Sequence, residues 1–129
     1  MPFIIGIDYD GTLFEGSYPK KGEPKWDIIN KVKEFKKNGA EIALWTCREG
    51  IGLEEAIERC KEVGLELDSI NENTPSELEY MRETYIKDGE KFGLRKIYAD
   101  FYLDDKSMNL DIFLKIAVAE TCERFKIRK

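Results

Sequence analysis

Histidine is absent from the 129-residue sequence. This absence excludes the Ser-His-Asp and Cys-His arrangements, in which an imidazole activates the nucleophile. Any catalysis by this chain must therefore use carboxylates, lysines and arginines, and charged residues make up 36% of the sequence.

Cysteine is scarce and widely spaced. Cys47, Cys60 and Cys122 are odd in number, lie far apart and form no Cys-x-x-Cys pair. This pattern disfavours both a disulfide framework and a thiolate zinc site, and it is typical of reduced thiols in a cytoplasmic protein. We therefore predict a cytoplasmic location, and we expect Cys60 to pack in the core.

Long hydrophobic runs are also missing. No apolar run approaches the length of a membrane span, and the first residues lack the basic and apolar regions of a signal peptide. We expect no membrane association. The formal net charge of −5 argues against broad attraction to nucleic acid or anionic lipid. The length predicts one domain over residues 1–129.

The stretch FIIGIDYDGTLF at residues 3–14 is the most informative part of the chain. Its short apolar run predicts a strand buried on both faces, as in the middle of a parallel sheet. Asp8 would then lie at the carboxyl end of the strand, where open α/β sheets bind ligands, with Asp10 just beyond and Gly11 allowing a sharp turn. Two such close carboxylates repel each other unless a cation or a shared proton is present. The alternative is an Asp-Gly turn with an extra aspartate.

Strand and helix patterns alternate along the rest of the chain. The predicted elements are a loop or flap (14–25), a helix (26–38), a strand (41–46), a helix (53–63), a weak strand (within 65–74), a helix (75–86), a loop (87–93), a strand region (96–105) and a final helix (110–125). This alternation predicts a single α/β sandwich with a parallel sheet.

Polar residues follow three of the predicted strands. Asp8, Thr46 and the pair Asp104–Asp105 would meet at one edge of a parallel sheet. Several carboxylates without a histidine or thiol partner favour a hard cation, Mg²⁺ first. Near them, Arg48 offers a planar fork for phosphate, the turn after Thr46 offers backbone N–H groups, and Lys96 offers a second positive charge.

With these residues placed, the sequence resembles the haloacid dehalogenase-like superfamily of phosphohydrolases. The resemblance depends on DYDGT at 8–12, the threonine that ends ALWT at 43–46, Lys96, and the acidic pair in FYLDD at 101–105. More narrowly, SYPKKGE, LWTCREG and ADFYLDD look like a group of small bacterial and phage-associated hydrolases without a substantial cap domain. A fainter similarity links the chain to the phosphatase domain of polynucleotide kinase–phosphatases. The resemblance implies a three-layer, Rossmann-like α/β sandwich.

The resemblance also implies a mechanism. Asp8 would be the nucleophile and form an aspartyl-phosphate, while Asp10 would protonate the leaving oxygen and later activate water. An aspartate at position 10 favours a phosphatase over the ion pumps of the superfamily. Thr46 would bond a phosphoryl oxygen, and Lys96 would hold the nucleophile and the phosphoryl group together.

Two ligand sets follow from the same resemblance. Mg²⁺ would be held by the side chain of Asp8, the backbone carbonyl of Asp10, and Asp104, with Asp105 close by. The phosphate would lie among Gly11, Thr12, Thr46, Cys47 (through its backbone N–H), Arg48 and Lys96. Arg95 is an alternative to Lys96 because the two are adjacent. Lys106 stands where the small hydrolases tend to have arginine.

The intervals between motifs bear on the substrate. Asp8 and Thr46 are 38 residues apart, and Thr46 and Lys96 are 50 apart, so predicted helices and loops leave no room for an independent cap. We therefore expect an open site whose specificity comes from the flap around Tyr18, from residues 71–73, or from a neighbouring subunit of a homo-oligomer. A small phosphorylated molecule is favoured as substrate; a polynucleotide end stays open, although the acidity disfavours it.

Two other classes of protein compete with this prediction. One is a non-catalytic module that binds phosphate or metal on the same fold. The other is a receiver domain, which has its acidic pair after the first strand and its phosphoacceptor aspartate after a middle strand. Here that middle strand ends in Thr46 and the adjacent acidic pair comes last, so the order of the motifs disfavours a receiver domain.

Overall fold

A computed structural model describes residues 1–16, 22–84, 97–107 and 109–126 of the chain. Its strands are β1 (Ile4–Ile7), β2 (Glu41–Leu44), β3 (Ser69–Ile70) and β4 (Phe101–Leu103). Its helices are α1 (Trp26–Lys37), α2 (Gly50–Glu62), α3 (Pro75–Thr84), α4 (Leu110–Leu114) and α5 (Val118–Lys126).

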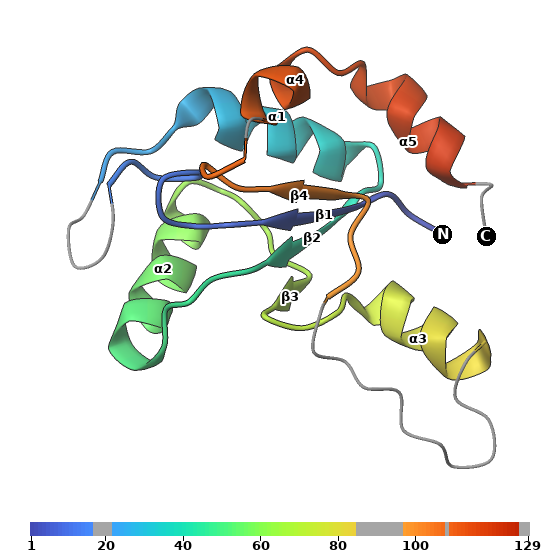
Figure 1. The fold of residues 1–129 in the computed structure, drawn as a ribbon, viewed down its shortest axis with the longest axis horizontal. Helices are drawn as coiled ribbons and strands as arrows, with labels where there is room; N and C mark the ends of the chain where they lie inside the picture. Colours follow the sequence, from blue (N-terminus) through green and yellow to red (C-terminus); the bar gives the residue numbers. More distant parts are fainter. Residues whose placement is uncertain (17–21, 85–96, 108, 127–129) are drawn as a thin grey trace.

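The four strands form one parallel sheet in the order β3-β2-β1-β4 (Figure 1). β1 lies between two neighbours, and all four of its residues are buried, as the apolar run predicts. Ile7 pairs with Leu44 on β2 and with Leu103 on β4, so these three strands end at the same edge. The predicted parallel α/β architecture is confirmed.

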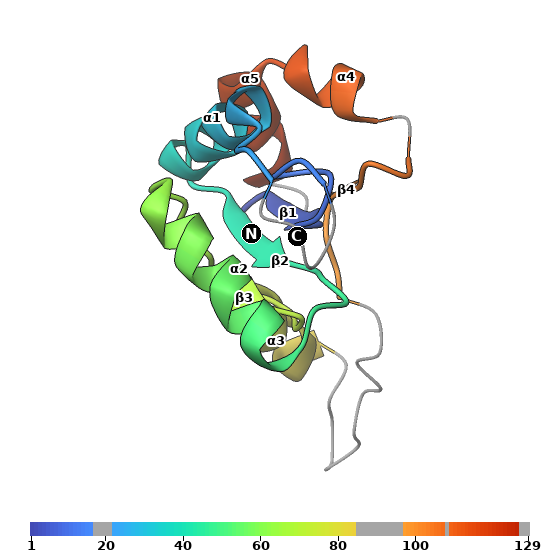
Figure 2. The ribbon, with the colours of Figure 1, turned by 90° about the vertical axis from the view of Figure 1, so that its left-hand side faces the viewer.

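One face of the sheet has most of the core. Phe3, Ile5 and Ile7 point to this face and join a buried cluster with residues of α1, α2, α4 and α5. α1 and α2 lie along this side (Figure 2), where Lys33 Nζ on α1 donates a hydrogen bond to the Val63 carbonyl at the end of α2. Phe35 of α1 stacks on Phe113 of α4 at 5.3 Å between ring centroids.

α3 and segment 97–100 cover the opposite face of the sheet and form the third layer of the sandwich. Ser76 on α3 donates a hydrogen bond to Glu41 on β2, which connects this helix to the sheet. Segment 97–100 also covers this face, because a Cβ at Gly6 would lie only 3.2 Å from Ala99 Cβ. Gly6 therefore interrupts the apolar run where the covering segment comes closest. Helices thus flank both faces, and the described residues include no large cap.

Several predicted boundaries are wrong by a few residues. β2 ends at Leu44 rather than Thr46, and the Trp45 side chain is 42% exposed. α2 begins at Gly50, three residues before the predicted start. Trp26 fits the helical spacing of the α1 core positions, yet it is 51% exposed because α1 buries Ile28 instead.

The predicted final helix is two helices, α4 and α5. On one continuous helix Phe113 and Val118 would point in directions about 140° apart, because five residues turn 500°. The break at residues 115–117 lets both side chains enter the core. Lys31 Nζ on α1 donates a hydrogen bond of 2.6 Å to the Ile116 carbonyl, which stabilises the break.

Some predictions fall outside the described residues. These are the flap residue Tyr18, the end of the third predicted helix, the loop at 87–93, and both Arg95 and Lys96. In the described part of the chain, no helix has the length and apolarity needed to cross a membrane.

Candidate active site

Three carboxylates meet at the carboxyl edge of the sheet. One oxygen each from Asp8, Asp104 and Asp105 lies within 4.8 Å of the others. Asp8 follows β1 and the acidic pair follows β4, and the Asp8 N–H donates a 2.9 Å hydrogen bond to the Leu103 carbonyl. The pairing of these two strands therefore brings together residues almost one hundred positions apart.

The first motif also positions Asp105. Thr12 Oγ1 accepts a 2.9 Å hydrogen bond from the Asp105 N–H, and the Thr12 side chain is fully buried. Gly11 has φ +80°, and a Cβ at this position would overlap the Asp105 carboxylate. Glycine is needed at position 11 both for the backbone conformation and for this close approach.

Asp104 is held by its own turn. Its Oδ1 accepts a hydrogen bond of 2.9 Å from the Lys106 N–H, and its carbonyl accepts one of 2.8 Å from Ser107 Oγ. The contribution of Lys106 to this turn comes from its backbone, which any residue except proline would supply.

Burial, together with nearby negative charges, shifts the ionisation of Asp8. Burial, more than any other cause, raises its pKa from 3.8 to about 7; the negative charge of Asp104 adds to this shift, and Asp105 and Asp10 add less. A backbone hydrogen bond at Tyr9 acts in the opposite direction. Without a cation, the cluster therefore favours a proton on Asp8 near neutral pH.

This donor set fits a hard divalent cation. The cluster offers three carboxylate oxygens, and Mg²⁺ prefers oxygen ligands. A cation at this position would also relieve the repulsion that raises the pKa of Asp8. The side chain of Asp10 is not part of the three-carboxylate cluster, so Asp10 would reach the cation through its backbone carbonyl, as the resemblance implies.

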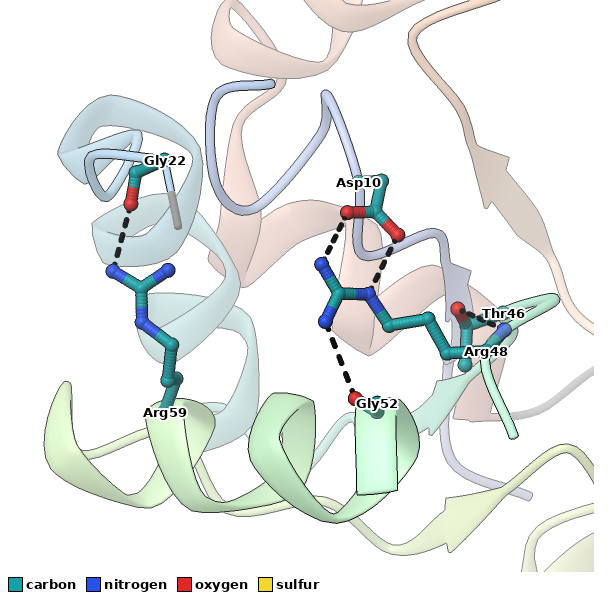
Figure 3. A network of polar contacts seen from close by, with 6 residues as sticks. All are labelled: Asp10, Gly22, Thr46, Arg48, Gly52 and Arg59. Atoms are coloured by element: carbon teal, nitrogen blue, oxygen red, sulfur yellow. Dashed lines mark hydrogen bonds and ion pairs between the residues drawn. The ribbon is translucent and has the colours of Figure 1, made fainter. Parts of the chain in front are cut away.

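The Asp10 carboxylate pairs with Arg48 instead (Figure 3). Arg48 Nε donates to Asp10 Oδ2 at 2.8 Å, and a terminal guanidinium nitrogen donates to Oδ1 at 2.7 Å. A further guanidinium nitrogen donates to the Gly52 carbonyl at 3.2 Å. Arg48, which the sequence predicts to contact phosphate, thus forms a two-pronged ion pair with Asp10 in this structure.

Thr46 lies in the loop between β2 and α2. Its hydroxyl oxygen accepts a hydrogen bond from the Arg48 N–H at 3.1 Å, and its own N–H donates to Asn71 Oδ1 at 2.8 Å. Asn71 has a positive φ of 53°, a conformation that asparagine tolerates better than most residues. Cys47 follows with an exposed side chain.

Thr12 requires a correction. We expected it to contact phosphate, but its side chain is buried and its hydroxyl accepts a hydrogen bond from the backbone of Asp105. Residues 71–73 were expected to contribute to substrate specificity. Asn71 supports Thr46. Asn73 is buried and accepts a hydrogen bond from the Tyr98 N–H, so it is not placed to select a substrate. Lys96 lies outside the described residues.

Arg59 was not among the residues predicted for this region. This α2 residue donates a hydrogen bond of 2.7 Å to the Gly22 carbonyl (Figure 3). Its guanidinium carbon lies 4.3 Å from the centroid of the Phe14 ring. Phe14 stacks on Tyr9. Arg59 thereby anchors the described end of the flap to α2. The position of Arg59 in the helical pattern does not predict this contact, because the partner is a backbone carbonyl 37 residues away.

Comparisons with known proteins show that the chain is similar in structure to a solved protein. The chain matches no family model and no curated protein. Among solved structures, it is similar to a conserved protein coded by a locus from Bacteroides thetaiotaomicron, with 28% sequence identity and a TM-score of 0.65. The match covers 100% of this chain and 93% of that one. The description of that protein names no activity, so the likeness supports the fold, and the chemistry must be inferred from the residues.

Proposed function

We propose that this protein is a Mg²⁺-dependent phosphohydrolase of the haloacid dehalogenase-like type. The observation behind this proposal is the meeting of Asp8 with Asp104 and Asp105 at the carboxyl edge of a parallel sheet, with Asp10 two residues beyond Asp8. Such an edge is where open α/β sheets bind ligands. The donor set suits Mg²⁺, and Asp8 is a carboxylate that a cation would keep ionised.

In this mechanism an Asp8 carboxylate oxygen attacks the phosphorus of a phosphate monoester. The bond from phosphorus to the ester oxygen breaks, that oxygen takes a proton from Asp10, and Asp8 becomes an aspartyl-phosphate. Asp10 then accepts a proton from water, whose oxygen attacks phosphorus; the bond from phosphorus to the Asp8 oxygen breaks, phosphate leaves and the Asp8 carboxylate is regenerated. Asp8, Asp104, Asp105 and the Asp10 carbonyl would hold Mg²⁺, which would supply charge neutralisation for the phosphoryl group. Thr46 would bond a phosphoryl oxygen.

The proposed substrate is a small phosphorylated molecule. The support for this choice is the formal net charge of −5, which repels a polyanion. The described thiols are all free, which agrees with the reduced cytoplasm that we predict as the compartment.

The test is release of phosphate from an aryl phosphate by the purified chain, with Mg²⁺ or with a chelator, and with Asp8→Asn alongside. We expect release that requires the cation and is abolished in Asp8→Asn. Equal rates in the variant would refute Asp8 as nucleophile. Binding of Mg²⁺ without turnover of any phosphate monoester would instead favour the non-catalytic module.

A further inference from the structure

We infer that Arg48 is a positioning residue for Asp10 and not a ligand for the substrate phosphate. The inference rests on the proposed function, because it assigns Arg48 a role in the proton transfers of that reaction. It goes beyond the resemblance, which suggested a phosphate contact for this residue.

The ion pair fixes the plane of the Asp10 carboxylate. Both oxygens accept hydrogen bonds, of 2.8 and 2.7 Å, from two different nitrogens of the same guanidinium. A two-pronged pair of this kind constrains direction as well as distance, because the guanidinium fork is planar and rigid. A single lysine ammonium would not impose this orientation.

Arg48 is itself held on several sides. Its side chain is only 7% exposed, its third nitrogen donates to the Gly52 carbonyl, and its guanidinium carbon lies 4.7 Å from the centroid of the Tyr9 ring. Binding a phosphate would require this group to give up acceptors that are already in place. The Asp10 side chain is more exposed, at 25%, and is therefore the partner that a molecule from solvent can reach.

Position matters for a residue that transfers protons. A general acid or base must lie within hydrogen-bond reach of the reacting oxygen, and a displacement of about 1 Å can lower the rate about 100-fold. While one Asp10 oxygen carries the proton for the leaving group, the other can remain bonded to Arg48. Loss of the two-pronged ion pair between Arg48 and Asp10 should therefore slow the departure of the leaving group most when that group needs a proton.

The dependence of the reaction rate on the leaving group distinguishes a positioning role of Arg48 from a role as phosphate ligand. A 2,4-dinitrophenolate leaves without a proton, whereas an alkoxide needs one. If Arg48 acts through Asp10, Arg48→Gln should lower kcat/KM, which reports the formation of the aspartyl-phosphate, by about 100-fold on an alkyl phosphate and by much less on 2,4-dinitrophenyl phosphate. Asp10→Asn should give the same pattern, and the double variant should lose little more than Asp10→Asn alone. The inhibition constant of inorganic phosphate should stay at the wild-type value.

Two further variants serve as controls for this test. Arg48→Lys keeps the charge without the fork and should show the same leaving-group pattern as Arg48→Gln. Arg59→Gln is the matched control: Arg59 also places its guanidinium against the Tyr9–Phe14 stack, but it donates to the Gly22 carbonyl and lies over Phe14 rather than bonding to Asp10. It should leave the ratio of the two rates unchanged. Thermal unfolding of every variant checks that the fold is retained.

The opposite pattern would overturn the inference. Equal losses on both esters, with a raised inhibition constant for inorganic phosphate, would identify Arg48 as a phosphate ligand and leave the proposed function intact. Failure of the wild-type protein to hydrolyse either ester would refute the proposed function, and the role of Arg48 with it.

Discussion

Asp8 combines two properties that depend on its immediate surroundings. It is half-buried at the end of β1, and it lies against two other carboxylates. Both conditions favour its protonated form, so its pKa rises to about 7. The same conditions would favour binding of a cation, because a cation would remove the penalty for the ionised form. The acid–base behaviour of Asp8 would therefore report on the proposed metal site before any substrate is present.

The first prediction concerns stability and pH. Without metal, the folded protein binds the Asp8 proton more tightly than the unfolded chain does between about pH 4 and about pH 7, so the contribution of Asp8 to the free energy of unfolding falls as pH rises through that window. Asp8→Asn cannot titrate there. We expect metal-free wild type to lose stability relative to Asp8→Asn between about pH 4 and about pH 7, measured by urea denaturation with a chelator. A difference that does not change with pH would contradict this account.

The second prediction concerns Gly11. Gly11→Ala would place a methyl group against the Asp105 carboxylate, so we expect at least a tenfold loss of Mg²⁺ affinity, about 1.4 kcal/mol, by titration calorimetry. Gly39→Ala is the matched control, because Gly39 also has a positive φ but has nothing within 4 Å of its Cβ position. Gly39→Ala should destabilise the protein and leave Mg²⁺ binding unchanged. Equal affinity losses in both variants would mean that strain, and not the clash with Asp105, is responsible.

Sequence alone was informative about the acidic residues and less so about their partners. Asp8, Asp104 and Asp105 could be placed together because each follows an apolar strand, and parallel strands share an edge. The partners of Thr12 and Arg48 could not be predicted, because spacing does not say which of several nearby acceptors or donors a side chain meets. The two residues lie 93 and 38 positions from their partners, Asp105 and Asp10.

At the scale of elements, the site depends on contacts between loops that follow different strands. The loop after β2 carries Thr46, and the loop after β3 supports it through the bond from the Thr46 N–H to Asn71 Oδ1. β3 has only two residues, yet its pairing with β2 brings Asn71 next to Thr46. A short edge strand is therefore sufficient to place a supporting side chain.

The third prediction tests this support. Asn71→Gly keeps the positive φ but removes the acceptor, so we expect about a tenfold lower kcat/KM for phosphate ester hydrolysis. Asn71→Asp keeps the acceptor oxygen and should retain more activity than Asn71→Gly. Steady-state kinetics of the two variants measure the difference. If Asn71→Gly were as active as wild type, the loop after β3 would have no part in the reaction.

Elements were predictable where periodicity was strong. The first helix was placed within one residue of its observed end, because Gly39 and the apolar spacing mark it clearly. The break between α4 and α5 was missed because residues 115–117 include no glycine or proline. It arises from tertiary contacts, namely the burial of both Phe113 and Val118 and the bond from Lys31 to the Ile116 carbonyl.

At the scale of the whole molecule, charge and architecture together limit the substrate. The sheet edge is reached by loops after β1, β2 and β4, and no cap domain encloses it in the described part of the chain. An open edge would admit large substrates, whereas the net charge of −5 opposes polyanions. Charge is therefore what separates the two substrate classes that the open site admits.

The fourth prediction follows from this charge. We expect kcat/KM for a small phosphate monoester to exceed that for a 3′-phosphorylated oligonucleotide at low ionic strength. Added salt should raise the rate on the oligonucleotide more than on the small ester, because screening weakens the repulsion of the polyanion. A higher kcat/KM on the oligonucleotide that falls with salt would indicate a local basic surface and a polynucleotide substrate.

The most direct test of the central claim is detection of phosphate on Asp8. The protein is mixed with an aryl phosphate and Mg²⁺, quenched in acid, digested and analysed by mass spectrometry for phosphorylated peptides. Asp10→Asn is the informative variant, because it should still accept a phosphoryl group from an activated ester but should activate water poorly, so the intermediate should accumulate. Asp8→Asn is the control that should show no phosphorylation.

We predict a phosphoryl group on the peptide that contains Asp8, more abundant in Asp10→Asn than in wild type and absent without Mg²⁺. Release of phosphate by the wild-type protein with no phosphopeptide in Asp10→Asn, or with the phosphoryl group on another residue, would contradict the assignment of Asp8 as the nucleophile.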